Sequence, residues 1–252
     1  MRTLYGLTQS AWTEKARWAL DHHGIAYRYH EHVPVLGEVF LRLKARPRPP
    51  GTKASVPLLV DGDQVLRSSL AIARHADELD RGEPGAKPLF PSGQESEVER
   101  WADLSDRMIG AARVRVLVGL RKSRAAQREA LPTFIPAPLR SLMTPMAVIA
   151  AMFLLSKYDA PRDADADAEA DNVLRPALDL VRKELGGRAT LLQDFTFADV
   201  AIAASLQALV PRALAPLGPA TRAVWQNVAL AREYEDLLAW RDEVYAKHRP
   251  GG

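Results

Sequence analysis

The hydroxyl of Ser10 is a candidate for chemistry because it stands where a short apolar strand gives way to a helix. The stretch LYGLTQSAWTEKARWALDHHG starts at Leu4, breaks at Gly6 and takes up helical spacing after Ser10. A serine at this point either caps the helix or faces something bound at the helix N-terminus. The residues alone leave both roles open. Two rival hydroxyls are nearby: Tyr5 is expected within the strand, and Thr13 one helical turn further on.

A second pair of hydroxyls stands before a later helix. Ser68 and Ser69 precede LAIARHADEL, whose apolar residues have helical spacing. Their hydroxyls, together with the first free N–H groups of the helix, could bind a carboxylate. One of them could instead cap the helix, and the two roles are compatible.

Several other kinds of site are excluded or disfavoured. The chain has no cysteine, which excludes disulfides, Cys-ligated zinc and a cysteine nucleophile. Lys plus Arg is 34 and Asp plus Glu is 31, with no long basic block, so nucleic-acid binding is not expected. The acidic stretch DADADAEAD resembles the opening of a calcium loop, but Ala168 and Leu174 replace the required glycine and glutamate. No metal is expected, and the six histidines lack metal-ligand spacing: His22, His23, His30, His32, His75 and His248.

No membrane span is expected. The chain opens without a basic-then-apolar leader, and its most apolar stretch, MAVIAAMFLL, is far shorter than the roughly 20 residues that cross a bilayer. That stretch is predicted to be a buried helix, with an exposed surface for a partner as the alternative. The absence of cysteine fits a reducing compartment, and we expect a cytoplasmic protein.

The first eighty residues alternate strand and helix patterns that would position these hydroxyls. Residues 3–5 form a strand candidate, and Gly24 is placed to end the first helix in a left-handed conformation. Period-two alternation over residues 25–30 predicts a second strand. A weaker helix over residues 37–45 is ended by a proline cluster. The apolar face of the first helix comprises Trp12, Ala16, Ala19 and Leu20.

The segment VPLLVDGDQVLRSS is the clearest local pattern. It predicts a strand over 56–60, a two-residue turn at Asp61-Gly62 and a return strand over 64–66. A parallel strand pair joined by a helix and followed by an antiparallel hairpin is a thioredoxin-like arrangement. We therefore predict an α/β thioredoxin-like domain over residues 1–80.

After this domain the strand patterns stop. The stretch RGEPGAKPLFPSG, residues 81–93, is rich in Pro and Gly and predicts a linker. Beyond it an all-α domain is expected over residues 94–252. Its helices are predicted over 95–120, 146–158, 172–185, 197–209 and 231–247.

This layout resembles the cytosolic glutathione transferases, and four segments support the comparison in order. LYGLTQSAWTEKARWAL resembles the first strand, active-site loop and first helix, with Ser10 at the catalytic hydroxyl of the serine-using classes. SVPLLVDGDQVL resembles the segment that carries the family's cis-proline, here Pro57. RSSLAI resembles the motif that grips the glutamyl end of glutathione. TFADVAIAA resembles the internal capping box, here Thr196 with Asp199, to which we assign no chemistry.

The resemblance implies that glutathione is the co-substrate, with no metal. Val56 would pair with the tripeptide backbone as an added strand does, next to a cis peptide at Pro57. The family's acidic residue is Ser68 here, and an uncharged acceptor would hold the substrate's ammonium more weakly. Lys53 and Arg67 could reach the other carboxylate, or could be solvated. The residues implied in glutathione binding are Trp12, Lys53, Val56, Pro57, Ser68 and Ser69.

The implied reaction adds the glutathione thiolate to a small apolar electrophile. A free thiol has a pKa of about 8.5, which a hydroxyl donor and a helix N-terminus would lower. Ser10 is placed to supply both. By analogy, Met108, Ala112 and Arg115 would form one wall of the electrophile pocket. The family also implies a homodimer, in which the first domain of one subunit meets the helical domain of the other.

Two alternatives remain at this level. A glutathione-dependent isomerase would add the thiol and release it again. A non-catalytic relative would bind glutathione or apolar ligands, or act as a partner module. Two features favour this alternative: the uncharged Ser68, and the apolar, proline-containing stretch over residues 131–155.

Overall fold

The computed structural model describes residues 1–47, 51–81, 85, 87–131, 136–158, 166–212, 214 and 217–249. The chain packs into two compact units that interleave along the sequence. The first unit comprises Met1–Asp106, Leu180–Leu206 and Asp236–Gly252, and the second Arg107–Asp179 and Gln207–Glu235. The domain limits expected from sequence, at residues 80 and 94, remain a prediction.

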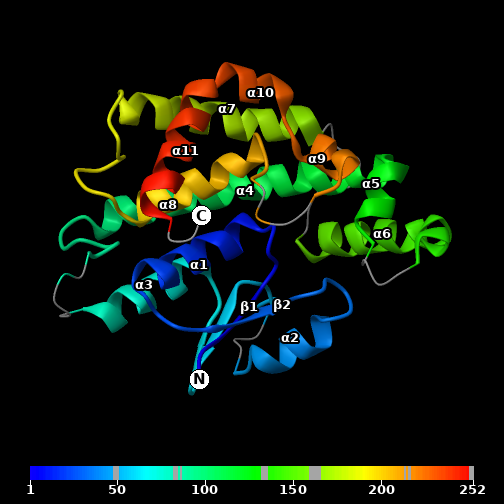
Figure 1. The fold of residues 1–252 in the computed structure, drawn as a ribbon, viewed down its shortest axis with the longest axis horizontal. Coiled ribbons are helices and arrows are strands. Elements are labelled where there is room, and N and C mark those ends of the chain that lie inside the picture. The colour runs from blue at the N-terminus through cyan, green and yellow to red at the C-terminus, as the bar shows by residue number, and fades with distance from the viewer. Residues whose placement is uncertain are drawn as a thin grey trace. The chain divides into compact units, whose positions relative to one another are not determined.

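A four-stranded sheet in the order β2-β1-β3-β4 lies in the first unit (Figure 1). Strand β1 (Thr3–Gly6) pairs in parallel with β2 (Arg28–Glu31) and antiparallel with β3 (Leu58–Asp61). Strand β3 then pairs antiparallel with β4 (Gln64–Leu66). The predicted thioredoxin-like arrangement is therefore confirmed.

Three helices accompany this sheet: α1 (Ala11–His22), α2 (Glu38–Lys44) and α3 (Ser69–Asp80). Helix α1 ends before Gly24, whose φ of +62° is the left-handed conformation expected there. Helices α1 and α3 pack against each other, and apolar side chains from both helices meet the sheet in one core. The fully buried members of that core are Leu4, Ala16, Leu20, Leu59, Ile72 and Ala76.

The hairpin differs from its prediction by one residue. Asp61 pairs with Gln64, so the turn is Gly62-Asp63 and not Asp61-Gly62. Gly62 adopts a φ of +58°, the positive value that the first position of such a turn requires. The Asp61 carboxylate has partners on two other segments. It accepts a hydrogen bond from Arg2 Nε at 2.7 Å and lies 2.9 Å from His75 Nε2.

Helices from the later part of the chain complete the first unit. They are the start of α4 (Glu95–Lys122), α8 (Phe197–Ser205) and α11 (Glu235–His248). Helix α8 packs on α1 and begins with the expected capping box. In this box Asp199 Oδ2 accepts from Thr196 N at 2.9 Å, and burial raises the pKa of Asp199 to about 6. The box has a structural role.

The end of α11 is fixed to α1. Arg249 Nε donates to Glu14 Oε1 at 2.8 Å, and its Nη1 donates to Asp21 Oδ2 at 2.7 Å. Trp18, which is fully buried, donates from Nε1 to the carbonyl of His248 at 3.0 Å. These contacts join residues more than 200 positions apart, which local patterns cannot predict.

The second unit is helical in its described residues. It holds α5 (Arg124–Glu129), α6 (Ala137–Lys157), α9 (Pro219–Trp225), α10 (Val228–Glu233) and most of α7 (Ala166–Leu185).

The later helices differ from their predicted bounds. The predicted helix over 197–209 ends in a short 3-10 turn, Leu206–Ala208, and the predicted helix over 231–247 is split into α10 and α11. Helices α5 and α9 were not predicted because each is too short for a clear periodicity. Helix α6 begins at Ala137 and runs through Pro145, whereas the helix predicted from sequence begins only at residue 146.

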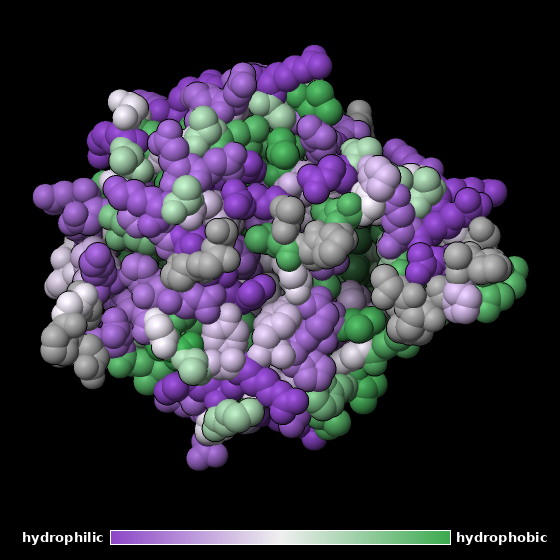
Figure 2. Space-filling model, in the orientation of Figure 1, coloured by the Kyte–Doolittle hydropathy of each residue, from purple (hydrophilic) through white to green (hydrophobic). Residues whose placement is uncertain are grey.

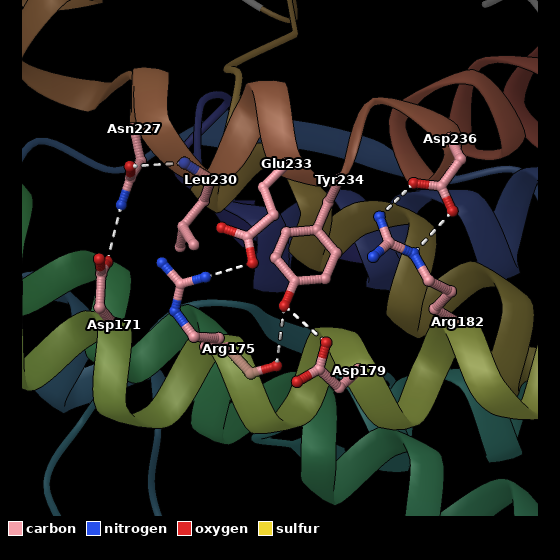
Figure 3. Close-up of polar contacts among 9 residues, drawn as sticks. All are labelled: Asp171, Arg175, Asp179, Arg182, Asn227, Leu230, Glu233, Tyr234 and Asp236. Atoms are coloured by element: carbon pink, nitrogen blue, oxygen red, sulfur yellow. Dashed lines mark hydrogen bonds and ion pairs between the residues drawn. The ribbon is translucent and has the colours of Figure 1, made fainter.

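Polar side chains spaced along α7 hold the segment that follows Asn227 (Figure 3). Tyr234, which is fully buried, donates to Asp179 Oδ1 at 2.7 Å, and burial raises the pKa of Tyr234 to about 12. Three further pairs share this arrangement: Asp171 with Asn227, Arg175 with Glu233, and, within the first unit, Arg182 with Asp236.

Helix α6 is buried along one face and exposed along the other. Ala147, Ala151 and Leu155 are buried in the second unit. Its exposed apolar side chains are Leu139, Leu142, Met146 and Ile149. Figure 2 shows hydrophobic residues, in green, on the surface at the right of the view, where Figure 1 draws α6. The predicted buried helix is therefore correct for one face only. None of the described helices is long and apolar enough to cross a membrane.

Candidate functional site

Ser10 is the residue directly before α1. Its φ of −82° and ψ of 125° are extended, its N–H donates to Leu7 O at 2.8 Å, and its carbonyl accepts from Glu14 N at 2.9 Å. Its side chain, however, makes no capping hydrogen bond to the helix. Of the two roles that the sequence left open, the side-chain cap is thus not realised. Ser10 is half-buried and directly precedes the first turn of α1, whose N–H groups point toward the start of the helix.

The two rival hydroxyls belong to the structure around Ser10. Tyr5 is 7% exposed and packs with Leu41 and Leu58 in a core cluster. Thr13 is fully buried, and its Oγ1 accepts a hydrogen bond from Leu7 N at 3.1 Å. Tyr5 thus lies in the strand as expected, and Thr13 holds the loop that leads to Ser10.

The loop between β1 and α1 is also held by β2. Glu31 accepts from Thr8 N at 3.1 Å through Oε1, and from Thr8 Oγ1 at 2.6 Å through Oε2. Tyr29 donates to the same Oε2 at 2.8 Å, and burial raises the pKa of Tyr29. A Cβ on Gly6 would lie 2.4 Å from Thr13 Cγ2, so glycine is needed there. No local pattern indicates the role of Glu31, because its partner Thr8 lies 23 residues away.

Trp12 and Lys15 point to one carboxylate on α4. Trp12 Nε1 donates to Asp106 Oδ1 at 2.8 Å, and Lys15 Nζ donates to the same oxygen at 2.5 Å. The Lys15 side chain is 1% exposed, whereas that of Asp106 is 47% exposed. Lys15 Nζ also donates to Ser105 Oγ at 3.1 Å. Lys15 and Asp106 were missed from sequence, because about 90 residues separate them.

The segment before β3 has the expected peptide geometry. The Val56–Pro57 bond is cis, as predicted. Pro57 is buried, Val56 is half-buried and Lys53 is exposed. A role in binding glutathione remains a prediction for all three.

Ser68 and Ser69 divide their roles at the start of α3. Ser68 is the N-cap, and its Oγ accepts from Ala71 N at 3.1 Å. Ser69 is 2% exposed at the first helical position. Ser68 therefore caps α3. A contact between its exposed side chain and a ligand stays a prediction.

Arg67 bonds to the protein's own backbone. Its Nη1 donates to Val65 O at 3.0 Å, and its Nη2 donates to Ala45 O at 3.1 Å and to Pro47 O. These bonds tie the end of α2 to β4. They give Arg67 a structural role, where the sequence had offered ligand binding or a solvated position.

The residues expected along the electrophile pocket lie on α4 within the second unit. Met108 is fully buried and Ala112 is 8% exposed. Arg115 binds Asp167 Oδ1 at 2.7 Å and donates to three carbonyls at the end of α9, those of Val224, Trp225 and Gln226. Arg115 thus caps α9, and the pocket itself remains a prediction.

Glu129 holds the opposite end of α9. Its carboxylate accepts from Ala220 N at 3.1 Å and from Thr221 N at 2.7 Å. Although burial opposes the effect, these bonds lower the pKa of Glu129. An anion at the start of α9 and a cation at its end both match the helix dipole. This matters for α9 because the helix has no buried residue.

Comparison with known proteins supports the resemblance noted from sequence. Residues 4–84 match the family described as glutathione S-transferase, N-terminal domain. No curated protein matches the chain in sequence. Among the described residues, no group of three or more His, Cys, Asp or Glu side chains is placed to hold a metal ion.

Solved structures of glutathione transferases share the fold over nearly the whole chain. A delta-class enzyme from Nilaparvata lugens has a TM-score of 0.57 at 19% identity, covering 99% of this chain and 90% of that one. One from Methylobacterium radiotolerans, in complex with glutathione sulfonate, has a TM-score of 0.62 at 17% identity, covering 98% and 91%. One from Methylobacillus flagellatus, with glutathione bound, has a TM-score of 0.56 at 14% identity, covering 98% and 96%. The fold is thus that of the glutathione transferases.

Proposed function

We propose that this protein is a glutathione transferase that activates the glutathione thiol at Ser10 and joins it to a small apolar electrophile. The observation that carries the proposal is the Ser10 side chain at the start of α1, which makes no capping bond to its own helix. It lies in the region that matches the glutathione S-transferase N-terminal domain. The fold around it is shared with proteins whose structures contain glutathione or its derivatives.

The proposed chemistry is stabilisation of a thiolate. The thiolate is the nucleophile, and a free thiol with a pKa of about 8.5 is mostly protonated at neutral pH. Ser10 Oγ would donate a hydrogen bond to the sulfur, while the first N–H groups of α1 add partial positive charge. Each unit by which the thiol pKa falls corresponds to about 1.4 kcal/mol of preferential stabilisation of the thiolate.

The rest of the tripeptide would lie along the segments around Val56 and the start of α3. The Val56 backbone would pair with the peptide, and Ser69 with the N–H groups of α3 would receive the glutamyl carboxylate. Ser68 offers the substrate's ammonium an uncharged oxygen that already accepts from Ala71 N. We therefore expect a glutathione Kd in the range of about 0.1–1 mM.

By analogy, the second substrate would bind near Met108 and Ala112. The proposal also includes a cytoplasmic location and a homodimer. Arg115 is a weaker candidate for that pocket, because Asp167 and the end of α9 occupy its guanidinium.

A non-catalytic binding protein is the second candidate. It is favoured by the exposed apolar side chains of α6, among them Leu142 at 78% and Ile149 at 62% exposure. It is also favoured by the uncharged Ser68. Such a protein could still bind glutathione, but it would not turn over an electrophile.

The test is calorimetry with glutathione followed by a turnover assay with a generic aromatic halide. The proposal expects saturable binding and enzyme-dependent conjugation. Saturable binding without conjugation would favour the second candidate. The absence of heat at glutathione concentrations tenfold above the expected Kd, together with no turnover, would overturn the transferase and would limit the second candidate to apolar ligands or a protein partner.

A further inference from the structure

Lys15 is a buried cation one and a half turns into the helix that Ser10 begins. Its side chain is 1% exposed, and Nζ contacts Asp106 Oδ1 at 2.5 Å and Ser105 Oγ at 3.1 Å. Ser105 Oγ in turn donates to Ala201 O of α8 at 2.8 Å. The position of the ammonium is therefore fixed by three helices.

Its partner carboxylate is held equally firmly but lies closer to water. Trp12 Nε1 and Lys15 Nζ both donate to Asp106 Oδ1, so that oxygen has a fixed place. The Asp106 side chain is nevertheless 47% exposed. Water screens an exposed charge more than a buried one. The charge of Lys15 is therefore screened by water less than the charge of Asp106.

We propose that the Lys15–Asp106 pair sets the electrostatic potential that a thiolate at Ser10 experiences. Five residues of α1 separate Ser10 from Lys15, so their Cα atoms lie about 7.5 Å apart along the helix axis. The ammonium extends beyond its Cα, and a poorly screened unit charge at roughly 10–15 Å still shifts a pKa by on the order of one unit. Lys15 would thus stabilise the thiolate in addition to the helix N-terminus, and the negative charge of Asp106 would cancel part of the Lys15 contribution.

The other charged groups around Lys15 are consistent with this role. Burial lowers the pKa of Lys15, and Asp106 and then Asp103 oppose that effect. On another part of α1, Glu14 is neutralised by Arg249 at 2.8 Å. Asp103 remains to favour the charged form of Lys15 when Asp106 is replaced.

The absence of cysteine provides a direct test. Ser10→Cys introduces a single thiol at the position in question, and its ultraviolet absorbance against pH gives its pKa without any ligand. We expect Lys15→Met in this background to raise the thiol pKa by about half a unit to one unit. Asp106→Asn, which keeps an acceptor for Trp12, should lower it. The double variant should return close to the Ser10→Cys parent.

The signs of the shifts decide the result. Shifts in the same direction, or no shift in either variant, would mean that the pair only holds α1 and α4 together, and would overturn the proposal. Glu97→Gln is the matched control, because Glu97 lies on α4 nine residues before Asp106 in an exposed pair with Arg100. That variant should leave the thiol pKa unchanged.

A second measurement separates this inference from the proposed function, on which its catalytic meaning rests. The same substitutions in the Ser10 protein should shift the pKa of bound glutathione with the same signs. Opposite shifts of the introduced thiol with no glutathione binding would uphold the inference and defeat the proposed function. Normal glutathione binding with an unresponsive introduced thiol would overturn the inference and leave the proposed function standing.

Discussion

At the scale of single residues, the serine and threonine hydroxyls near the starts of α1 and α3 make different hydrogen bonds. Thr13 accepts from the loop backbone, and Ser68 accepts from the first turn of α3. Ser10 occupies the N-cap position of α1, but its side chain makes no capping hydrogen bond. A side chain without a capping bond does not provide the roughly 1 kcal/mol that an N-cap normally contributes. The proposed hydrogen bond from Ser10 to a ligand would therefore not have to replace a capping bond.

Replacing Ser10 by alanine should affect the reaction more than stability. A hydrogen bond to a charged group is worth about 1.5–3 kcal/mol, so the conjugation rate at neutral pH should fall roughly 10- to 100-fold. The loss should shrink as pH rises, because solvent then deprotonates the thiol without help. Thiolate absorbance of bound glutathione against pH is the measurement. Superimposable titration curves for wild type and Ser10→Ala would remove Ser10 from the mechanism.

Ser68→Glu should tighten glutathione binding. A carboxylate at this position would meet the substrate's ammonium with a charge, and hydrogen bonds between charged groups are about twice as strong as neutral ones. Glutamate can also remain near the helix start, where a negative charge is favourable. Calorimetry on both proteins measures the change in Kd. An unchanged Kd in a folded variant would show that Ser68 is only the cap of α3.

At the scale of elements, charged or titratable side chains lie at the ends of α9 and α1 and stabilise them. Helix α9 has a carboxylate at its start and a guanidinium at its end. At the end of α1, His23 Nδ1 lies 2.8 Å from Asp80 Oδ2, and its Nε2 lies 3.2 Å from Asp77 Oδ1, both on α3. Although burial opposes it, the Asp77 and Asp80 carboxylates raise the pKa of His23. The contact between α1 and α3 should therefore weaken as pH rises.

The His23 contact should stabilise the fold most at mildly acidic pH. A histidine whose pKa is raised on folding contributes stability that is fully present below its unfolded pKa of about 6.5. That contribution is lost as pH rises through the raised folded pKa. The difference in unfolding free energy between wild type and His23→Gln should thus be larger at a pH of about 6 than at about 8.5. Urea unfolding at both values measures it.

The adjacent His22 is a matched control with the opposite sign. Burial lowers the pKa of His22, so its contribution is present above about 6.5 and is lost as pH falls through the lowered value. His22→Gln should therefore show its larger difference at the higher pH. Equal differences at both pH values for His23→Gln would contradict the linkage.

At the scale of the whole molecule, each unit has exposed apolar side chains. In the first unit these include Leu36 at 68% and Val39 at 69%, around α2. In the second unit they are the exposed residues of α6 described above. Apolar surface of this kind is common at sites where another molecule binds.

The protein should sediment as a homodimer at micromolar concentration. The expectation rests on the proposed family function and on this exposed apolar surface. Sedimentation equilibrium at several concentrations measures the mass directly. A mass equal to one chain, 27.8 kDa, at every concentration would contradict the dimer.

The sequence by itself determined the elements whose causes are local. The cis bond at Pro57 was predicted only through the family resemblance. By contrast, the second strand to within three residues, the hairpin to within one residue and the capping box at Thr196 each follow from residues a few positions apart. The position of Ser10 before α1 is of the same kind. Short-range sterics and hydrogen bonds decide these features, so a local pattern is enough to predict them.

Only the tertiary structure decided which polar side chains meet. Lys15 and Asp106 lie on helices about 90 residues apart, and Arg115 meets the end of α9 more than 100 residues later. No periodicity indicates that a lysine on an amphipathic helix will be buried beside a carboxylate, because burial depends on which helix packs there. For the same reason the sequence offered Arg67 as a ligand-binding or solvated residue, whereas packing turned it onto the carbonyls at the end of α2.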